Sequence, residues 1–355
     1  MAVDPLVKVQ LALRNQVSRN LHTVCDSQHA FTAFLLALDT MYDTKGLRVV
    51  RDKDMQGPEI QFDYETGLPV VAGVQHQAAA LSAFVIAAAE NHAIRGARMG
   101  YSAYQGAETI RKSTLNRMKR SPQSAVPYIK KVAKAMSRAV VKDLDEDLFP
   151  STNMVDNATT YHWGEDHVMA IAYPLQDPAS GTYEYANLNL NASGYTGIKA
   201  VVAGNGTTGF GLPTPSNLRK KLIFPLRHTR EAKPDIGLCD SDVLDYMITN
   251  AEQSVLIDMS DKLNFGATVI KCVGLMWMPV DRLNVLANTA SQKRELYVLE
   301  SEHHRWMSWG VGDDVKVIDD LPREPGNVSL QTYYECAYVN ELPRNDARAY
   351  DVVLS

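Results

Sequence analysis

The stretch "SPQSAVPYIKKVAKAMSRAVVKDLDEDLFP", residues 121–150, carries the strongest structural signal in the chain. Ser124 can cap a helix, Pro127 suits a first turn, and Pro150 ends the pattern. The spacing therefore predicts one helix over residues 127–149, a rod of about 34 Å. Its apolar residues fall on a single helical face: Val126, Ile129, Val132, Ala133, Met136, Val140, Leu144 and Leu148.

The chain around this helix has the composition of an ordinary globular protein. It has 355 residues, of which 45% are hydrophobic and 22% charged, enough to bury the core of one large or two medium domains. The net charge of −5 and the pI near 6.0 do not indicate a nucleic-acid binder as a whole. Its scattered cysteines form no C-x-x-C pair, which argues against a zinc ribbon and favours a reducing compartment.

The sequence shows no signal for secretion or for a membrane. The start, "MAVDPLVKVQ", lacks the pattern of a signal peptide. The longest apolar run, residues 78–89, is shorter than the roughly 20 residues that a transmembrane helix needs. We therefore expect a soluble cytoplasmic product with no membrane partner.

The first hundred residues predict an arm, a helix and a β-rich loop. Residues 1–26 fit a helical or extended arm, and residues 27–42 have helical spacing. Residues 45–71 contain short β-prone pieces separated by Gly-Pro and Thr-Gly pairs, a pattern typical of a hairpin or a projecting β-loop. The expected strands are Leu47–Arg51, Glu59–Tyr64 and Leu68–Val71, and residues 93–106 are also expected to be extended.

The second half predicts strands with few helices. In "KPDIGLCDSDVLDYM", residues 233–247, a strand over Ile236–Cys239 precedes a cap at Asp240 or Ser241 and then a helix. Residues 268–281 and 294–300 have the composition of buried strands, and residues 328–353 predict two strands joined around residues 343–346. The balance indicates an α+β protein.

Three polar stretches invite a catalytic interpretation, and each favours an ordinary structural role. "GNGTTG", residues 204–209, matches G-x-G-x-x-G, yet Pro213 and Pro215 forbid the helix that a dinucleotide site needs. "HWGEDH", residues 162–167, lacks the H-E-x-x-H spacing. In "YVLESEHHRW", residues 297–306, the adjacent histidines His303 and His304 point apart and do not easily share a metal.

No motif for catalysis or for a cofactor emerges. The chain has neither a G-x-S-x-G elbow nor a Walker loop. A Ser/His/Asp triad stays open, because such partners meet in space and not in sequence. We therefore assign no catalytic, cofactor-binding or metal-binding residues, and we expect a protein that is not an enzyme.

One electrostatic feature does stand out. Between Arg95 and Lys142 the chain has 12 Lys or Arg residues and a single acid, Glu108. Such a stretch is typical of phosphate binding without base readout, and equally of a solvated helix face. As candidates for contact with DNA we select Arg111, Lys112, Arg117, Lys119, Arg120, Lys130, Lys131, Lys134 and Arg138.

The order of these segments resembles the major capsid proteins of tailed bacteriophages, which have the Hong Kong 97-type fold. The similarity is best in residues 233–247, in "VIKCVGLMWMPVDRL" (269–283), in "RELYVLESEHHRWMS" (294–308) and in the closing strands. It implies an N-arm, an extended β-loop, a long spine helix, a peripheral domain and an axial domain. Glu300 to Trp306 would then form a strand-to-helix transition in a shell subunit.

The resemblance also implies domain bounds. Residues 1–26 would form the N-terminal arm, and residues 27–44 with 106–165 the peripheral domain that holds the spine helix. Residues 45–105 would form the extended loop. Residues 166–320 would be mainly the axial domain, with a local insertion expected at 170–232, and residues 321–355 the closing strands of the peripheral domain.

The function implied is that of a structural coat protein. It would assemble with itself into hexamers and pentamers of an icosahedral shell around double-stranded DNA, made in the host cytoplasm and ending in the virion. A portal is implied as a partner, as is a separate scaffolding protein, because no long N-terminal prefix is visible; a decoration protein is a further candidate. The alternatives are a host nanocompartment shell of the same fold, a non-catalytic DNA-binding protein and, last, a metal-dependent hydrolase.

Overall fold

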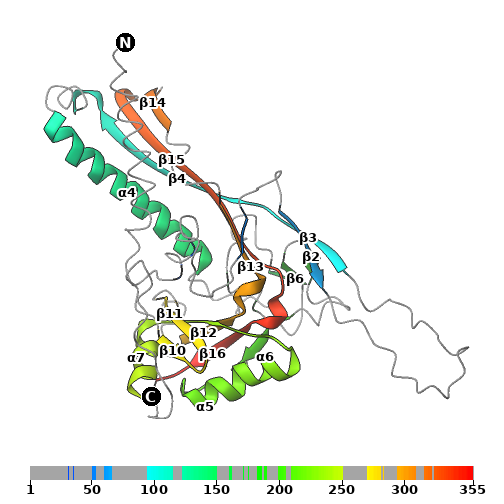
Figure 1. The fold of residues 1–355 in the computed structure, drawn as a ribbon. Helices are drawn as coiled ribbons and strands as arrows, with labels where there is room; N and C mark the ends of the chain where they lie inside the picture. The colour runs from blue at the N-terminus through cyan, green and yellow to red at the C-terminus, as the bar shows by residue number, and fades with distance from the viewer. Residues whose placement is uncertain are drawn as a thin grey trace, which may run out of the picture.

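The computed structural model arranges the chain as an elongated upper part above a domain built on a second sheet (Figure 1). The upper part contains one long helix and a long β-ribbon, and the lower domain contains the C-terminus. The structure describes residues 31, 35, 50–52, 60–65, 94–114, 122–149, 160–161, 171, 175, 182–185, 188–189, 199–204, 209–250, 270–280, 283, 294–308, 316–321 and 324–354.

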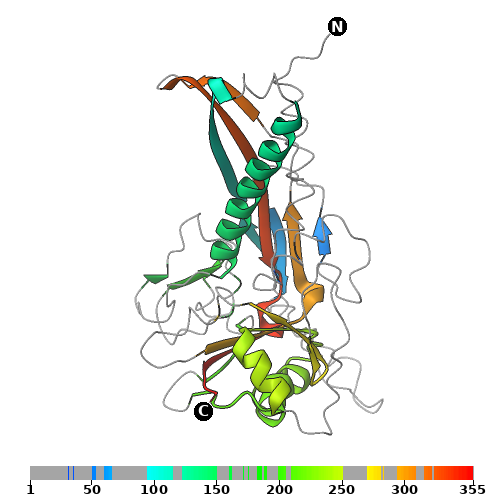
Figure 2. The same cartoon turned by 90° about the vertical axis from the view of Figure 1, so that its left-hand side faces the viewer.

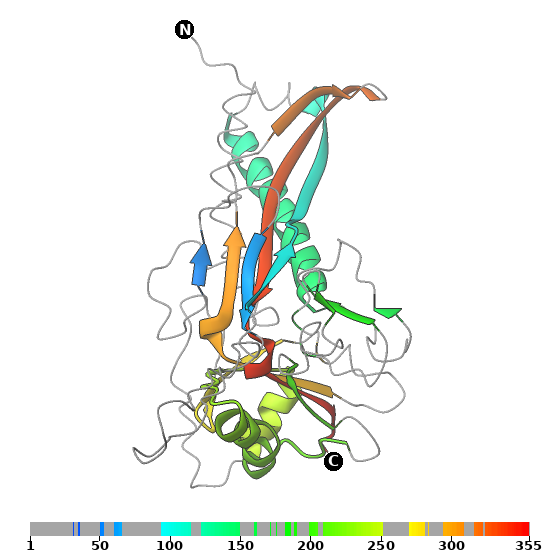
Figure 3. The same cartoon turned by 90° about the vertical axis from the view of Figure 1, so that its right-hand side faces the viewer.

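The upper part is built on β15, Glu324–Asn340, the longest strand described. β4, Ser102–Arg111, pairs with it antiparallel from Asn327 opposite Arg111 to Cys336 opposite Ser102. The other partners of β15 are β14, Lys316–Leu321, and β13, His304–Ser308. Figure 3 shows β1, Val50–Asp52, beside β13, with which it pairs in parallel.

The long helix α4, Pro122–Leu148, lies along β4 (Figure 2). Its buried side chains recur every four residues, which confirms the predicted face over the described part of the helix: Val132, Met136, Val140, Leu144 and Leu148. The helix begins at Pro122, five residues before the predicted start at Pro127. Pro122, and not Pro127, is therefore the proline in its first turn.

The predicted N-terminal helix is described at two buried residues. Phe31 and Leu35 are helical and fully buried. The Phe31 ring packs edge-on against Phe149, with the centroids 6.2 Å apart, and against Tyr338 at 6.1 Å. These contacts join the start of the chain, the end of α4 and the lower end of β15.

The lower domain is a six-stranded mixed sheet in the order β10-β11-β9-β12-β16-β8. Its strands are Ile270–Cys272 (β10), Leu275–Pro279 (β11), Ile236–Cys239 (β9), Arg294–Leu299 (β12), Ala347–Val352 (β16) and Val201–Ala203 (β8). The central strand β9 runs parallel to β11 and antiparallel to β12.

Two helices share the core of this domain. One is α7, Ser241–Thr249; the other is a continuous helix built from α5 (Pro215–Leu218), a π-helical turn η5 (Arg219–Ile223) and α6 (Phe224–Thr229). Both bury apolar residues in a single cluster with Trp277, Leu296 and Val298.

The turn chemistry of this domain follows the sequence closely. β9 has the predicted bounds, and Asp240 caps α7 by accepting a hydrogen bond of 2.7 Å from the Val243 backbone N–H. β10 and β11 form a hairpin whose two turn residues, Val273 and Gly274, both have positive φ, as a type I′ turn requires.

The strand partners differ from the expectation in the β-loop. β2, Ile60–Glu65, pairs with β3, Ile94–Met99, and β1 joins a separate sheet, so these pieces do not form a local hairpin. Alternation and turn residues predict strands, but partners this far apart in the chain are chosen by tertiary packing. The expected strand Leu68–Val71 lies outside the described residues.

The closing strands also divide in a way that the sequence did not predict. β15 belongs to the upper sheet, whereas β16 pairs with β12 and β8 in the lower domain. β8 and the helix Pro215–Thr229 also contribute residues to the lower core, and the local insertion expected at 170–232 stays a prediction. The small sheet of β5 (Thr160–Tyr161), β6 (Thr182–Tyr185) and β7 (Leu188–Asn189) lies outside both.

The close approach of β9 to β11 gives a stability test. A Cβ atom at Gly237 would lie 2.5 Å from the indole ring of Trp277, which is fully buried. We expect Gly237→Ala to lower the free energy of unfolding by about 1–3 kcal/mol, because the packed ring has to move. Gly100→Ala, where a Cβ meets nothing within 4 Å, should change it by less than about 0.5 kcal/mol. Urea unfolding of the purified chain measures both changes in the free energy of unfolding, and equal effects would contradict the packing described.

Candidate functional site

The basic residues described on α4 form one exposed face. Lys131, Arg138 and Lys142 are exposed and lie seven and four residues apart, which places them on the same side of the helix. This side faces away from the buried residues Val132 and Met136. Lys142 Nζ lies 3.9 Å from Glu146 Oε1, a weak pair between exposed groups. We call Lys131, Arg138 and Lys142 the α4 basic face.

The other candidate residues are only partly described. Arg111 is exposed at the end of β4, and Lys112 is half-buried in the helical turn that follows. Neither Arg111 nor Lys112 therefore belongs to α4, the helix that carries the α4 basic face. Arg117, Lys119 and Arg120 lie outside the described residues, as do the side chains of Lys130 and Lys134.

The acidic end of α4 has a structural role. The Tyr104 hydroxyl, on β4, donates a hydrogen bond of 2.7 Å to Asp147 Oδ2. Burial raises the pKa of Tyr104, as do the nearby Cys336 and the hydrogen bond to Asp147. Asp147 is half-buried, and the neighbouring Asp145 is buried. The bond from Tyr104 to Asp147 thus ties the C-terminal turn of α4 to the ribbon.

A buried polar cluster connects the upper sheet to the lower domain. We call it the junction: Asp235, Glu300, Ser301, His304, Asn340, Asn345 and Asp346. At its centre, Asp346 accepts hydrogen bonds from the Glu300 backbone N–H at 2.8 Å and from Asn340 Nδ2 at 2.6 Å. His304 Nε2 lies 3.1 Å from Asp346 Oδ2, and both side chains are 1% exposed. One carboxylate thus holds the ends of β12, β13, β15 and β16.

Two further carboxylates of the junction, those of Glu300 and Asp235, also accept hydrogen bonds. Glu300 accepts from the Lys233 backbone N–H at 2.8 Å and from Asn345 Nδ2 at 2.5 Å. Ser301 N–H donates to Asp235 Oδ1 at 2.8 Å, and its hydroxyl donates to Asp235 Oδ2. These polar groups therefore bind one another within the junction.

The stretch with two histidines is part of the same junction. β12 ends at Leu299, a 3₁₀ turn spans Ser301–His303, and β13 begins at His304. The expected strand-to-helix transition is correct only for one 3₁₀ turn, because His304 to Trp306 already belong to the strand β13. His304 Nδ1 lies 2.6 Å from the Tyr338 hydroxyl, whereas His303 is partly exposed, 3.6 Å from Glu300.

The rings of His303 and His304, although adjacent in the sequence, thus contact different residues. Within the described ranges no group of His, Cys, Asp and Glu has the geometry to hold a metal ion. Burial, and then the charge of Asp346, raise the pKa of Tyr338.

A buried ion pair in the lower sheet was missed by the sequence reasoning. Arg348 on β16 donates to Glu295 Oε2 on β12 from Nε at 3.0 Å and from Nη2 at 2.7 Å. Tyr297 donates to the same oxygen at 2.6 Å, and the Arg348 guanidinium lies 4.2 Å from the Tyr350 ring centroid. The sequence does contain a sign of this pair, because polar residues alternate with apolar ones in both strands and so lie on one face of the sheet.

The first glycine of the glycine-rich candidate is a packing site. Gly204 follows β8 with φ +86°, and a Cβ there would lie 2.3 Å from the Tyr350 carbonyl oxygen. Residues 205–208 lie outside the described residues, and the next helix described starts at Pro215, after Thr214 as its cap. The "HWGEDH" stretch, residues 162–167, lies outside the described residues.

No protein-family model matches this chain, and no curated protein does. Among solved structures it is similar to the cyanophage A-1(L) capsid asymmetric unit, with TM-score 0.58 and 14% identity over 88% of this chain and 96% of that chain.

Two further structures align at lower TM-scores. Mycobacterium phage Ogopogo aligns at 0.49, with 13% identity over 86% of this chain and 90% of that chain. An encapsulin complex from Synechococcus elongatus aligns at 0.48, with 12% identity over 88% and 87%.

The cyanophage likeness identifies the class of fold. The chain has an α+β fold of the Hong Kong 97 capsid type, and its resemblance to phage major capsid proteins is confirmed at the level of the fold. In the described part of the chain, no helix has both the length and the apolar character needed to cross a bilayer.

The junction gives a second stability test. We expect Asp346→Ala to lower the free energy of unfolding by about 3–5 kcal/mol, because it leaves buried donors without an acceptor. Asp346→Asn keeps one acceptor oxygen and should therefore lower the free energy of unfolding by less than Asp346→Ala does. The exposed Asp245 offers the control, and Asp245→Ala should stay within about 0.5 kcal/mol of the wild type. Thermal unfolding ranks the three, and an Asp346→Ala protein as stable as the control would contradict the role given to the junction.

Proposed function

We propose that the chain is a structural major capsid protein. It assembles with itself into hexamers and pentamers of an icosahedral shell that encloses double-stranded DNA in a bacteriophage virion. The observation that carries this proposal is the likeness to the cyanophage capsid chain along almost the whole length of both proteins. The role is structural, and no catalytic group is assigned.

The shape of the upper part supports a role in assembly. β4 and β14 each pair with β15 alone among the described strands, so each presents an edge that another chain can cover. The ribbon extends far from the lower core (Figure 1). In a shell, many such contacts per subunit add up, although each alone can be weak.

We further propose that the α4 basic face contacts the packaged DNA. Its exposed charges suit phosphates and need no base readout. Neutralising phosphates in this way releases counterions, so the contact should weaken steeply with salt. A portal and a scaffolding protein are the other partners proposed, and a decoration protein is a further candidate.

Assembly is the first experiment. The purified chain, alone and with the products of its neighbouring genes, should form closed shells or hexamer and pentamer rings in sedimentation velocity and negative-stain electron microscopy. Shells that hold a protein cargo and no DNA would favour the nanocompartment alternative. Small uniform particles under every condition would overturn the shell proposal, and if they bind DNA they would favour the plain DNA-binding alternative.

DNA contact is tested by charge removal. Lys131→Gln combined with Arg138→Gln should reduce the slope of log Kobs against log salt by about 2 for a linear duplex, because each lost phosphate contact removes about 0.9. Lys233→Gln combined with Lys271→Gln removes the same charge from exposed lysines of the lower domain and should leave the slope unchanged. An equal change in both variants would mean that the α4 basic face is merely solvated.

A further inference from the structure

The helix Pro215–Thr229 presents an unusual outer side. Phe224 is 59% exposed, the most exposed large hydrophobic residue among those described. Its ring packs on His228, with the centroids 4.0 Å apart. Arg219, Lys220 and Arg227 are exposed around it. We call Arg219, Lys220, Phe224, Arg227 and His228 the α6 patch.

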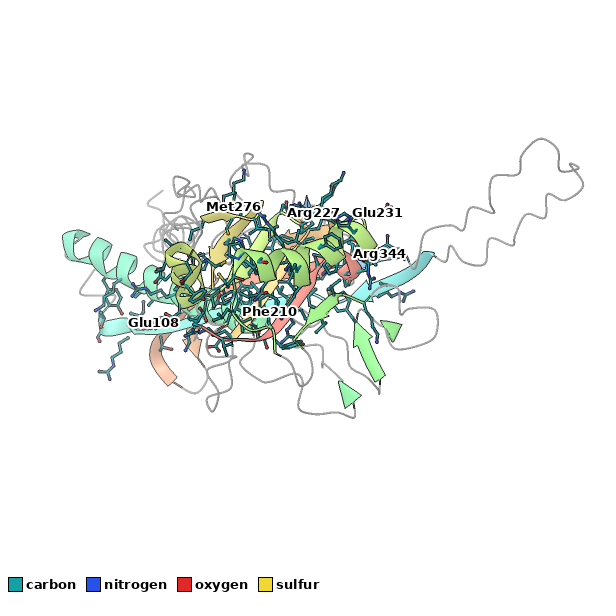
Figure 4. All side chains as sticks on the ribbon, turned by 90° about the horizontal axis from the view of Figure 1, so that it is seen from below. Glu108, Phe210, Arg227, Glu231, Met276 and Arg344 are labelled. Atoms are coloured by element: carbon teal, nitrogen blue, oxygen red, sulfur yellow. The ribbon has the colours of Figure 1, made fainter. Side chains whose placement is uncertain are left out.

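The local backbone explains why this side is turned outward. Pro225 lacks an N–H, and its ring would collide with the Lys221 carbonyl in a regular helix. The π-helical turn just before it widens the helix, so that Phe224 N–H bonds the Arg219 carbonyl. Leu218, Leu222 and Leu226 stay buried below. Viewed from below, Arg227 and the buried Phe210 lie on different sides of the helix (Figure 4).

The cations of the α6 patch remain exposed to solvent. Arg219, Lys220 and Arg227 form no ion pair with any residue that the structure describes. From residue 215 to residue 230 there is no acid, and the first to follow is Glu231. Lys221 is different, because its Nζ donates to the Phe210 carbonyl at 2.7 Å. An exposed aromatic ring surrounded by arginine is typical of a protein interface.

The opposite side of the same domain is acidic. α7 exposes Asp242 and Asp245 and has no Lys or Arg. Asp242 pairs with Arg294, which also binds Asp240 at 2.7 Å, while Asp245 has no ion-pair partner among the described residues. Figure 1 shows α7 at the left of the lower domain and α6 toward its right.

We infer that copies of the chain associate head to tail, the α6 patch of one copy against the acidic side of α7 on the next. Two different surfaces on opposite sides of one domain make a heterologous contact, which closes into a ring when the rotation per copy allows it. Opposite charges favour the encounter and fix the register, and Phe224 supplies the buried apolar contact. This inference rests on the proposed shell function, for which it names the contact within a ring.

Charge reversal and its compensation test the inference. Lys220→Glu combined with Arg227→Glu should raise the subunit concentration for half-assembly at least about tenfold, because like charges then face each other. Adding Asp245→Lys to the charge-reversed variant should return the concentration for half-assembly to within about threefold of the wild type, since opposite charges meet again. Lys233→Glu combined with Lys271→Glu changes the net charge equally at two exposed lysines outside the α6 patch and should leave assembly unchanged.

The outcomes separate the two proposals. If the wild type never assembles, the shell function fails, independently of the α6 patch. If the wild type assembles and the reversed variant does so equally well, or if Asp245→Lys gives no recovery, the head-to-tail contact is wrong. A reversed variant that assembles normally but retains less DNA would make the α6 patch a nucleic-acid surface. Circular dichroism confirms that each variant is folded.

Discussion

The buried carboxylate of Asp346 is the constraint on which the architecture depends. It lies where the chain leaves β15 in the upper sheet and enters β16 in the lower domain, and it binds the Glu300 N–H, Asn340 and His304. A buried charge is stable only when its hydrogen bonds are made, so the position of Asp346 determines how the ends of the strands meet. Among the described residues, these polar groups therefore help to hold the two sheets in one relative arrangement.

The upper part and the lower domain, which meet at this junction, are packed in different ways. The upper part is thin, with α4 held along β4 by apolar residues at four-residue spacing and by the bond from Tyr104 to Asp147. The lower domain is thicker, with two helices sharing one core against the sheet. A rigid joint between a long ribbon and a compact domain suits a subunit that has to reach its neighbours at a defined angle.

Local signals predicted the elements well and their partners poorly. The bounds of β9, the Asp240 cap, the buried face of α4 and the structural role of His304 all follow from spacing and turn chemistry. The division of the closing strands between two sheets did not, because it depends on the hydrogen bonds of Asp346 with residues far away in the chain. The α6 patch was also missed, because the π turn sets which side of that helix is exposed, and it results from one proline within an otherwise helical run.

A cryo-electron microscopy reconstruction of the assembled particle tests the proposed shell most directly. We expect a closed icosahedral shell in which α4 turns its basic face inward and the lower domains form rings, with α6 of one copy against α7 of the next. A particle with the ribbon at the ring centres, or with α4 on its outer surface, would contradict it.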